Sequence, residues 1–321
     1  MMKEIGGYFE LELQPAANQL FDDQAVFVNS GRNAFEYIIL SLPKINKLWM
    51  PYYTCSSLQE PIKRLGLHVC YYHVSKQLEI ESLETLNIGK DDYLLYTNYF
   101  GVKNTYADYL QTVYPDNLIL DNSQALFYPP SRLCFYSPRK FVGIPDGGVA
   151  YSPFKYEVKE QDKLSYMRCS HLLKRHDFPA SEGYSDFKEN SLTISNQPLR
   201  LMSNLTKRML SSIDFSSILE VRKNNFTYLD SMLNRENSLK FDLKRGIIPL
   251  VYPLLTRNEF FRSQLIYNKV YVATYWPKLP QLTNVKSELN LSEYIIPLPV
   301  DQRYNEEDLC DIINIYKYGK R

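Results

Sequence analysis

Between residues 24 and 152, short apolar runs alternate with segments whose apolar residues recur at helical spacing. Two helices are expected here, one over residues 32–42, ended by Pro43, and one over residues 57–65, with Gly66 in the usual C-terminal position. The apolar runs predict strands at residues 25–28, 48–50, 68–73, 93–97, 118–120, 133–136 and 148–151. Strands that alternate with helices are typical of a mostly parallel sheet covered by helices, so the pattern predicts an α/β fold.

The pattern changes in the second half of the chain. Residues 154–233 are polar and helix-rich, and a second α/β unit follows them. The strands expected in this unit are residues 247–255, 270–274 and 295–299. A last helix is expected to start near Glu306, with Asn305 as its N-cap. We therefore expect a large domain over residues 1–235, which includes an N-terminal arm, and a smaller C-terminal α/β domain over residues 236–321.

The composition is that of an ordinary globular protein, with 45% apolar and 23% charged residues. The formal net charge is +1, so no overall field draws the chain to nucleic acid or to an anionic membrane, and neither partner is expected. No apolar stretch is long enough to span a bilayer, and the N-terminus lacks the apolar core of a secretory signal. The five cysteines are spread without CxxC spacing, which indicates free thiols in a reducing compartment and no metal site. We therefore expect a cytoplasmic protein.

Polar residues follow two of the expected strands in an order that suits one cofactor. Asp121 and Gln124 come after the fifth strand, and Ser137 and Lys140 come after the sixth. Pyridoxal phosphate (PLP) needs a carboxylate against its ring nitrogen, a lysine amine for its aldehyde, and a hydroxyl with backbone N–H groups for its phosphate. Asp121, Lys140 and Ser137 supply these groups, and Gln124 suits the ring hydroxyl. Each also has a simpler interpretation, since Asp121 suits a helix N-cap and most Ser-x-x-Lys pairs are surface residues.

A phosphate-binding turn is expected at Ser30, Gly31 and Arg32, where a strand meets a helix. In open α/β sheets, ligands bind beyond the carboxyl ends of the strands, and the N–H groups at a helix start favour phosphate. Considered alone, a Ser-Gly pair at a helix start is more often only a cap.

Seven segments together resemble the DegT/DnrJ/StrS family of sugar aminotransferases, which are PLP enzymes of fold type I. These segments are residues 28–34, 50–55, 120–125, 135–140, 145–148, 272–277 and 296–299. The order of Asp121, Gln124, Ser137 and Lys140 is the most specific part of the resemblance. It implies the PLP-dependent transferase fold type I, a mostly parallel central sheet flanked by helices, with residues 1–235 as the PLP-binding domain.

The resemblance also implies a role for each matching residue. Lys140 would bond covalently to the cofactor and later move a proton, and Asp121 would pair with the ring nitrogen. Gln124 would contact the ring hydroxyl, and Ser137 would bind the phosphate together with the turn at residues 30–32.

Three further positions are candidates by the same resemblance. Asn98 matches a position where the family often has a histidine that faces the site, which implies contact with the substrate. Cys55 stands where the family usually has the aromatic residue that stacks on the cofactor ring, and Tyr53 is a candidate to replace that residue.

A local basic cluster over residues 168–176 is the candidate substrate site outside these motifs. Arg168, His171 and Lys174 would meet the diphosphate of a nucleotide-linked sugar, because guanidinium and ammonium groups suit phosphate oxygens. A solvated helix face explains the cluster equally well.

By resemblance, the expected function is that of a PLP-dependent aminotransferase in nucleotide-sugar and polysaccharide biosynthesis. It would move an amino group from an amino acid, glutamate by resemblance, to a keto-sugar linked to a nucleotide, and it would act as a homodimer. One alternative is other PLP chemistry, such as sugar dehydration, against which Lys140 argues because the related dehydratases carry histidine there. Another is a regulatory relative without turnover, suggested by Cys55 and by the poor match of residues 195–200 to the segment that family members donate across the dimer.

Overall fold

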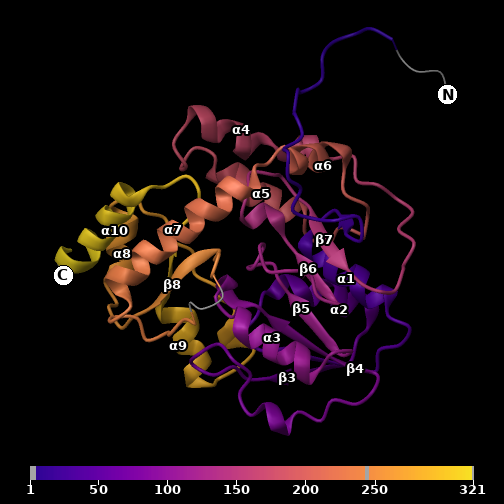
Figure 1. Cartoon of the computed structure of the whole chain (residues 1–321), viewed down its shortest axis with the longest axis horizontal. Coiled ribbons are helices and arrows are strands. Elements are labelled where there is room, and N and C mark those ends of the chain that lie inside the picture. Colours follow the sequence, from indigo (N-terminus) through magenta and orange to yellow (C-terminus); the bar gives the residue numbers. More distant parts are fainter. Residues whose placement is uncertain (1–4, 243–245, 320–321) are drawn as a thin grey trace.

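A seven-stranded sheet runs through the middle of the protein in the computed structural model, which describes residues 5–242 and 246–319 (Figure 1). Its strand order is β1-β7-β6-β5-β4-β2-β3. The strands are β1 (Val26–Val28), β2 (Lys47–Pro51), β3 (Val69–Tyr72), β4 (Asp92–Thr97), β5 (Leu118–Asp121), β6 (Cys134–Tyr136) and β7 (Gly148–Tyr151). Neighbours from β3 to β6 run parallel, and β7 is antiparallel to both β1 and β6. The predicted, mostly parallel α/β sheet is confirmed, with each strand at or within two residues of its expected bounds.

Helices cover the sheet because its strands carry apolar side chains on both faces. Leu95 and Ile119 belong to a core cluster under α1 (Gly31–Ser41) and α2 (Gln59–Leu65). Their neighbours Leu94 and Leu120 belong to a second cluster on the other face, where α3 (Asn104–Val113) packs. Side chains of successive residues in a strand point to opposite faces, so two covered faces require continuous apolar runs.

The helix boundaries follow local signals in the sequence. The Ser30 side chain accepts a hydrogen bond from the Asn33 backbone and so caps α1. Helix α2 ends at Gly66, whose φ of 62° lies in the left-handed region that glycine adopts without strain. Short 3-10 turns connect other elements: η1 (Ser56–Leu58), η2 (Leu83–Thr85), η3 (Tyr99–Gly101), η4 (Pro138–Lys140), η5 (Ser165–Arg168) and η7 (Leu279–Gln281).

The middle of the chain is helical, as predicted from its polar, helix-rich pattern. It contains α4 (Ser170–Asp177), α5 (Tyr184–Thr193), α6 (Asn204–Ser211) and α7 (Phe215–Leu233). Figure 1 shows α7 running between the large sheet and the C-terminal elements.

The C-terminal part has one antiparallel strand pair, β8 (Val251–Leu255) with β9 (Ile295–Pro299). Helices α8 (Phe261–Tyr267), α9 (Lys286–Tyr294) and α10 (Glu306–Tyr318) pack around it. Asn305 caps α10 through a capping box with Asp308, which confirms the predicted helix start.

The strand predicted at residues 270–274 is wrong. These residues pair with no strand in the part of the chain that the structure describes, and most of them are exposed. The Ala273 carbonyl instead accepts a hydrogen bond of 2.7 Å from the Arg262 guanidinium. A strand is only stable when its backbone finds a neighbouring strand, and the apolar pattern alone does not report such a neighbour.

A single core cluster extends from the β4 and β5 side chains to β8, β9 and α10, so the large sheet and the C-terminal part are packed together. The five cysteines form no disulfide, which confirms the expected free thiols. Across the described ranges, no helix combines the length and the apolar character needed to cross a bilayer.

Candidate cofactor site

An acidic side chain ends strand β5 at the edge where parallel strands present their carboxyl ends. Asp121 is 2% exposed. Its Oδ1 accepts a hydrogen bond of 2.9 Å from the Ser123 backbone, and the Thr97 hydroxyl donates to its Oδ2 at 3.4 Å. In the parallel pairing of β4 with β5, Thr97 is the partner of Asp121, so it lies directly beside the acid. Asp121 is thus the last residue of β5, at the edge where ligands bind in open α/β sheets.

The lysine of turn η4 reaches the same place. Lys140 Nζ donates a hydrogen bond of 2.9 Å to Ser123 Oγ. Ser123 therefore contacts the acid with its backbone and the amine with its side chain. Sequence reasoning missed Ser123, although Asp-x-Ser is a pattern in which the aspartate commonly bonds the backbone two residues on.

Burial raises the pKa of Asp121, and the positive charge of Lys140 with the hydrogen bonds of Ser123 and Thr97 opposes that shift. A buried carboxylate is unfavourable unless a cation or several donors compensate it. The site therefore favours a ligand that brings positive charge to Asp121.

Three segments of backbone meet at the start of α1. A Cβ atom added to Gly31 would lie 2.9 Å from Ser137 Cβ and 3.1 Å from Ser137 Oγ. A Cβ atom added to Gly148 would lie 2.2 Å from the Ser30 carbonyl oxygen. Glycine is required at both positions for this close approach. The predicted phosphate turn at Ser30–Gly31 thus lies against Ser137, which comes 106 residues after Gly31 in the sequence.

A backbone hydrogen bond holds the Gln124 side chain in one orientation. Its Oε1 accepts a hydrogen bond of 2.7 Å from the Phe100 backbone, and the residue is 2% exposed. With Oε1 occupied, Nε2 is the end of the amide that suits an acceptor such as a ring hydroxyl oxygen. Phe100 has a φ of 56°, a conformation that non-glycine residues rarely adopt and that structures retain mainly where surrounding contacts fix it.

Tyr53 and Cys55, the candidates for ring stacking, occupy different environments. Tyr53 is fully buried, and its ring packs on Tyr99 and, edge to face at 4.3 Å, on Trp276. Cys55 is half-buried with its Sγ 3.0 Å from Ser57 Oγ. The Tyr53 ring is thus part of a buried aromatic cluster with Tyr99 and Trp276, whereas the Cys55 side chain is partly exposed to solvent.

Asn98 does not face an open site, contrary to the expectation from the sequence. It is fully buried. Its Nδ2 donates to Asn104 Oδ1 at 2.9 Å, and its Oδ1 accepts from the Lys103 backbone at 3.2 Å. Both ends of the amide thus bond residues at the start of α3.

The basic cluster of residues 168–176 is also occupied by contacts within the chain. Arg168 is buried and bonds Asp146 and Asp162, each at 2.7 Å. Lys174 pairs with Asp186 at 2.8 Å, and the His171 ring packs on Phe187. A diphosphate would have to displace these partners, so the structure does not support the predicted substrate role of the cluster. The alternative of a solvated face is also incomplete, because Arg168 is a core residue.

Arg32, the third residue of the predicted phosphate turn, points to a neighbouring helix. Its guanidinium pairs with Glu60 of α2 and donates to Ser195 Oγ at 3.3 Å. The structure thus brings together Ser30, Gly31 and Ser137 on one side, and Asp121, Gln124 and Lys140 on the other.

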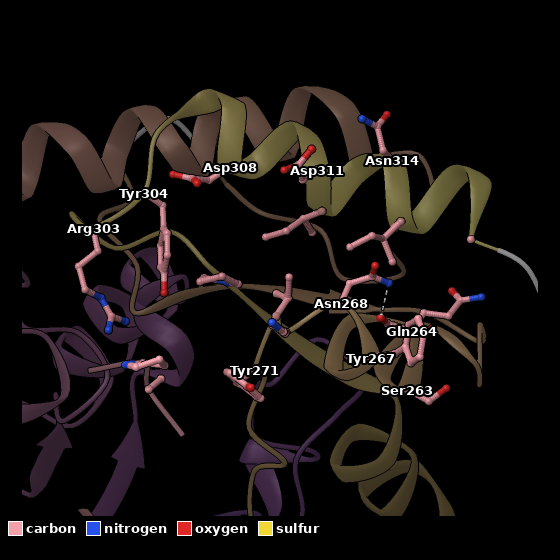
Figure 2. Close-up of a pocket in the computed structure, with 18 of the residues that line it drawn as sticks. Ser263, Gln264, Tyr267, Asn268, Tyr271, Arg303, Tyr304, Asp308, Asp311 and Asn314 are labelled. Carbon is pink, nitrogen blue, oxygen red and sulfur yellow. Dashed lines mark hydrogen bonds between the residues drawn. The ribbon is translucent and has the colours of Figure 1, made fainter. Parts of the chain in front are cut away.

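A separate groove lies between α8 and α10 (Figure 2); Arg175 of the basic cluster lines it, and the other predicted site residues do not. Figure 2 shows Asp308, Asp311 and Asn314 on α10 above Gln264 and Tyr267 of α8. The Asn268 side chain bonds the Gln264 carbonyl at 2.8 Å across the end of α8. The chemical groups of the candidate site are therefore outside this groove.

The side chains at the candidate site have the chemical groups that bind PLP. A buried acid, an amine linked to it through one serine, and a hydroxyl against a glycine turn are the groups that the ring nitrogen, aldehyde and phosphate need. No group of three or more histidine, cysteine, aspartate or glutamate side chains with metal-ligand geometry occurs within residues 5–242 and 246–319.

No protein-family model matches the sequence, and no curated protein is similar to it in sequence. Solved structures do match. CalS13, a sugar aminotransferase from Micromonospora echinospora, is 15% identical, with 92% of this chain and 88% of that chain covered and a TM-score of 0.63. A DegT DnrJ EryC1 StrS aminotransferase from Brucella abortus is 13% identical, with 92% and 86% covered and a TM-score of 0.63. Spr1654 from Streptococcus pneumoniae, in its PLP form, is 16% identical, with 91% and 86% covered and a TM-score of 0.62.

At these identities the likeness concerns the fold, and it extends over both the large sheet and the C-terminal part. It confirms the fold type that the sequence motifs predict. The chain has the fold of the DegT/DnrJ/EryC1/StrS-type sugar aminotransferases.

Proposed function

We propose that this chain is a PLP-dependent aminotransferase that moves an amino group from an amino acid, glutamate, to a keto-sugar linked to a nucleotide. The observation that carries the proposal is the bridge from Asp121 through Ser123 to Lys140. The fold supports it, since a sugar aminotransferase and a PLP-form structure share that fold.

Different residues would hold the two ends of the cofactor. Asp121 would pair with the ring nitrogen, and Gln124 Nε2 would donate to the ring hydroxyl oxygen. Ser137 and the backbone of Ser30 and Gly31 would bind the phosphate. When bound, PLP supplies an aldehyde and an electron-withdrawing ring that makes the α-proton of an amino acid removable.

Lys140 would act as the general base and acid of the reaction. Its amine would accept the proton from the α-carbon of the amino-acid donor and pass it to the former aldehyde carbon of the cofactor, and it would move a proton in the reverse sense when the keto-sugar is aminated. This role requires the amine to stay within hydrogen-bond reach of both carbons. Ser123 Oγ accepts a bond from this amine at 2.9 Å, which keeps the lysine at the ring-binding end of the site.

Asp121 would keep the ring nitrogen protonated. Burial disfavours its anion, and a cation placed against it would restore the charged form. The acid and the ring nitrogen would thus stabilise each other's charged states inside a site with little water.

We further propose that the protein acts as a homodimer in the cytoplasm and that residues 1–235 and 236–321 form its two domains. Exposed apolar side chains near the N-terminus support the dimer: Ile5, Tyr8 and Phe9 are 95%, 99% and 93% exposed. Figure 1 shows this segment extending away from the rest of the chain, as expected for an arm that packs on another copy.

An absorbance experiment tests the proposal. Protein mixed with PLP should show a visible band from the covalent bond to Lys140, and glutamate should bleach it. Lys140→Ala should abolish the band, whereas Lys155→Ala, which removes an exposed lysine outside the site, should keep it. No band in the native protein would disprove the cofactor assignment. A band that no amino acid bleaches would disprove the aminotransferase and leave the cofactor assignment standing.

The acceptor is tested separately by mass spectrometry. Protein preloaded with an amino group from glutamate should convert a nucleotide-linked keto-sugar to the amino sugar and leave the free keto-sugar largely unreacted. Equal conversion of both would contradict the nucleotide-linked acceptor.

A further inference from the structure

Two arginines lie side by side on one face of helix α5 and its C-terminal extension. The Arg139 guanidinium donates to Ser191 Oγ at 3.4 Å, and the Arg32 guanidinium donates to Ser195 Oγ at 3.3 Å. Ser195 in turn donates to the Ser191 carbonyl at 3.1 Å. Residues four apart in a helix share a face, so the two guanidinium groups meet the same turn.

The negative charge near these arginines balances only one of them. Arg32 pairs with Glu60, whose second oxygen accepts a bond of 2.8 Å from the Asn196 backbone. In the described part of the chain, no carboxylate lies within ion-pair distance of Arg139, which donates to Ser191 and lies over the Phe187 ring, 6.0 Å from its centroid. Burial and the charge of Arg32 both lower the pKa of Arg139, while Asp146 opposes them from a distance.

Asp146 cannot serve as the missing partner. Its Oδ2 bonds Arg168 at 2.7 Å, and its Oδ1 accepts from the Thr206 hydroxyl at 2.6 Å. A half-buried guanidinium without a carboxylate, next to a second one, is an unfavourable arrangement unless an anion from outside the chain completes it.

The two arginines flank the contact between the turn at residue 31 and Ser137. Arg32 follows Gly31 directly, and Arg139 stands between Ser137 and Lys140 in η4. The lysine side chain turns to Ser123, whereas the arginine before it turns to α5. Positive charge therefore lies on the α5 side of the candidate site, opposite the acid at the end of β5.

We propose that Arg139, with Arg32 beside it, forms a phosphate-binding site next to the lysine turn. Guanidinium groups match phosphate oxygens with paired N–H donors, and charge-assisted bonds of this kind are the strong ones. The phosphate belongs either to the cofactor or to the nucleotide part of the substrate. The assignment of the phosphate to the cofactor or to the nucleotide rests on the proposed function, whereas the affinity of the site for phosphate does not.

A purely structural role for Arg139 makes a different prediction. If its contacts with Ser191 and Phe187 mainly held α5 in place, Arg139→Gln would lower the unfolding midpoint in phosphate-free buffer. An unfilled anion site predicts the opposite: Arg139→Gln removes repulsion from Arg32, so the midpoint in phosphate-free buffer stays equal or rises.

The first experiment measures inorganic phosphate binding to the full chain by calorimetry, together with unfolding midpoints. Arg139→Gln should weaken phosphate binding roughly tenfold or more, as expected for loss of a charge-assisted bond, and Arg139→Lys should lose less. Arg235→Gln, which removes an exposed arginine just after α7, is the matched control and should bind as the native protein does. Equal phosphate affinity of Arg139→Gln and the native protein would overturn the proposal, as would a lowered midpoint of Arg139→Gln without phosphate.

The second experiment identifies the source of the phosphate. If the cofactor supplies it, Arg139→Gln should weaken binding of PLP roughly tenfold and leave binding of pyridoxal, which lacks the phosphate, unchanged. If the nucleotide supplies it, binding of uridine diphosphate should weaken and that of PLP should not. Unchanged affinity for all three would overturn the proposal. Lys140→Ala keeps both arginines and should still bind inorganic phosphate, so failure of the aminotransferase proposal and failure of this one are distinguishable.

Discussion

Lys140 and Asp121 are joined through one residue, since Ser123 accepts a hydrogen bond from the lysine amine and donates its backbone N–H to the aspartate. The amine comes from turn η4 and the acid from the end of β5, which are adjacent because β5 and β6 pair in parallel. An acid and an amine that both contact Ser123 can bind two different parts of one small ring. Ser123 thereby sets the distance between the Asp121 carboxylate and the Lys140 amine.

The hydroxyl of Ser123 is expected to affect both stability and rate. Ser123→Ala removes the acceptor of Lys140 and should lower the free energy of unfolding by about 1 kcal/mol, the net value of a typical hydrogen bond. It should also slow the bleaching of the PLP band by glutamate roughly tenfold, because the amine is then less well positioned. Stopped-flow absorbance measures the rate. Ser123→Thr keeps the hydroxyl and is the control; a Ser123→Ala rate equal to that of the native protein would contradict the positioning role.

The titration of Asp121 gives a prediction for cofactor-free protein. Burial raises the pKa of this acid in the folded state, so its protonated form is favoured by folding. Its contribution to stability is present below the unfolded value of about 4 and is lost as the pH rises through the folded pKa. The Asp121→Asn variant lacks this pH-dependent loss of stability. The free energy of unfolding of the variant minus that of the native protein should therefore increase from about pH 4 to about pH 7.

Urea unfolding at the two pH values measures this difference, with Asp186→Asn as a control at a partly exposed carboxylate whose pKa is lowered to about 2. PLP should reverse the order. It should bind Asp121→Asn more weakly by about 1.5–3 kcal/mol, because the ring nitrogen loses its charged partner. A stability of Asp121→Asn relative to the native protein that falls from about pH 4 to about pH 7 without PLP would contradict the sign.

The close contact of Gly31 with Ser137 predicts a steric effect. Gly31 is not among the glycines with positive φ, so alanine suits its backbone and only the new methyl group matters. That group would lie 2.9 Å from Ser137 Cβ, and Gly31→Ala should cost about 1–3 kcal/mol and weaken PLP binding. In Gly143→Ala the methyl group would lie 3.9 Å from Leu172, an ordinary contact, and stability should change by less than about 0.5 kcal/mol. Chemical unfolding and PLP titration of both variants provide the comparison, and equal effects would argue against a tight contact.

The ion pairs of the basic cluster differ in burial and should differ in energetic effect. Arg168 bonds two buried acids, so Arg168→Met leaves both charges without their partner and should destabilise the protein by about 3–5 kcal/mol. The Lys174 side chain is 43% exposed in its pair with Asp186, and Lys174→Met should change stability by at most about 1 kcal/mol. Denaturant midpoints measure both. Similar values for the two variants would show that Arg168 is not the centre of a buried network.

Local patterns in the sequence were enough to predict most elements of the large sheet and the order of its functional residues. Continuous apolar runs report strands buried on both faces, and Gly66 and Asn305 report helix ends, because these signals depend on neighbouring residues only. Asp121, Ser137 and Lys140 were also accessible from the sequence, since each follows a recognisable strand and the carboxyl ends of parallel strands share one edge.

The tertiary structure decided which polar groups remain available. Asn98 is occupied by the start of α3 and Arg168 by two aspartates, while residues 270–274 find no strand to pair with. Ser123 links Lys140 to Asp121 only because the fold brings separate segments together. For the same reason Arg139 contacts Ser191 and has no carboxylate partner among residues 5–242 and 246–319. The physical reason is that the availability of a side chain depends on the donors, acceptors and charges that fold against it. Those partners lie far away in the sequence, where no local pattern records them.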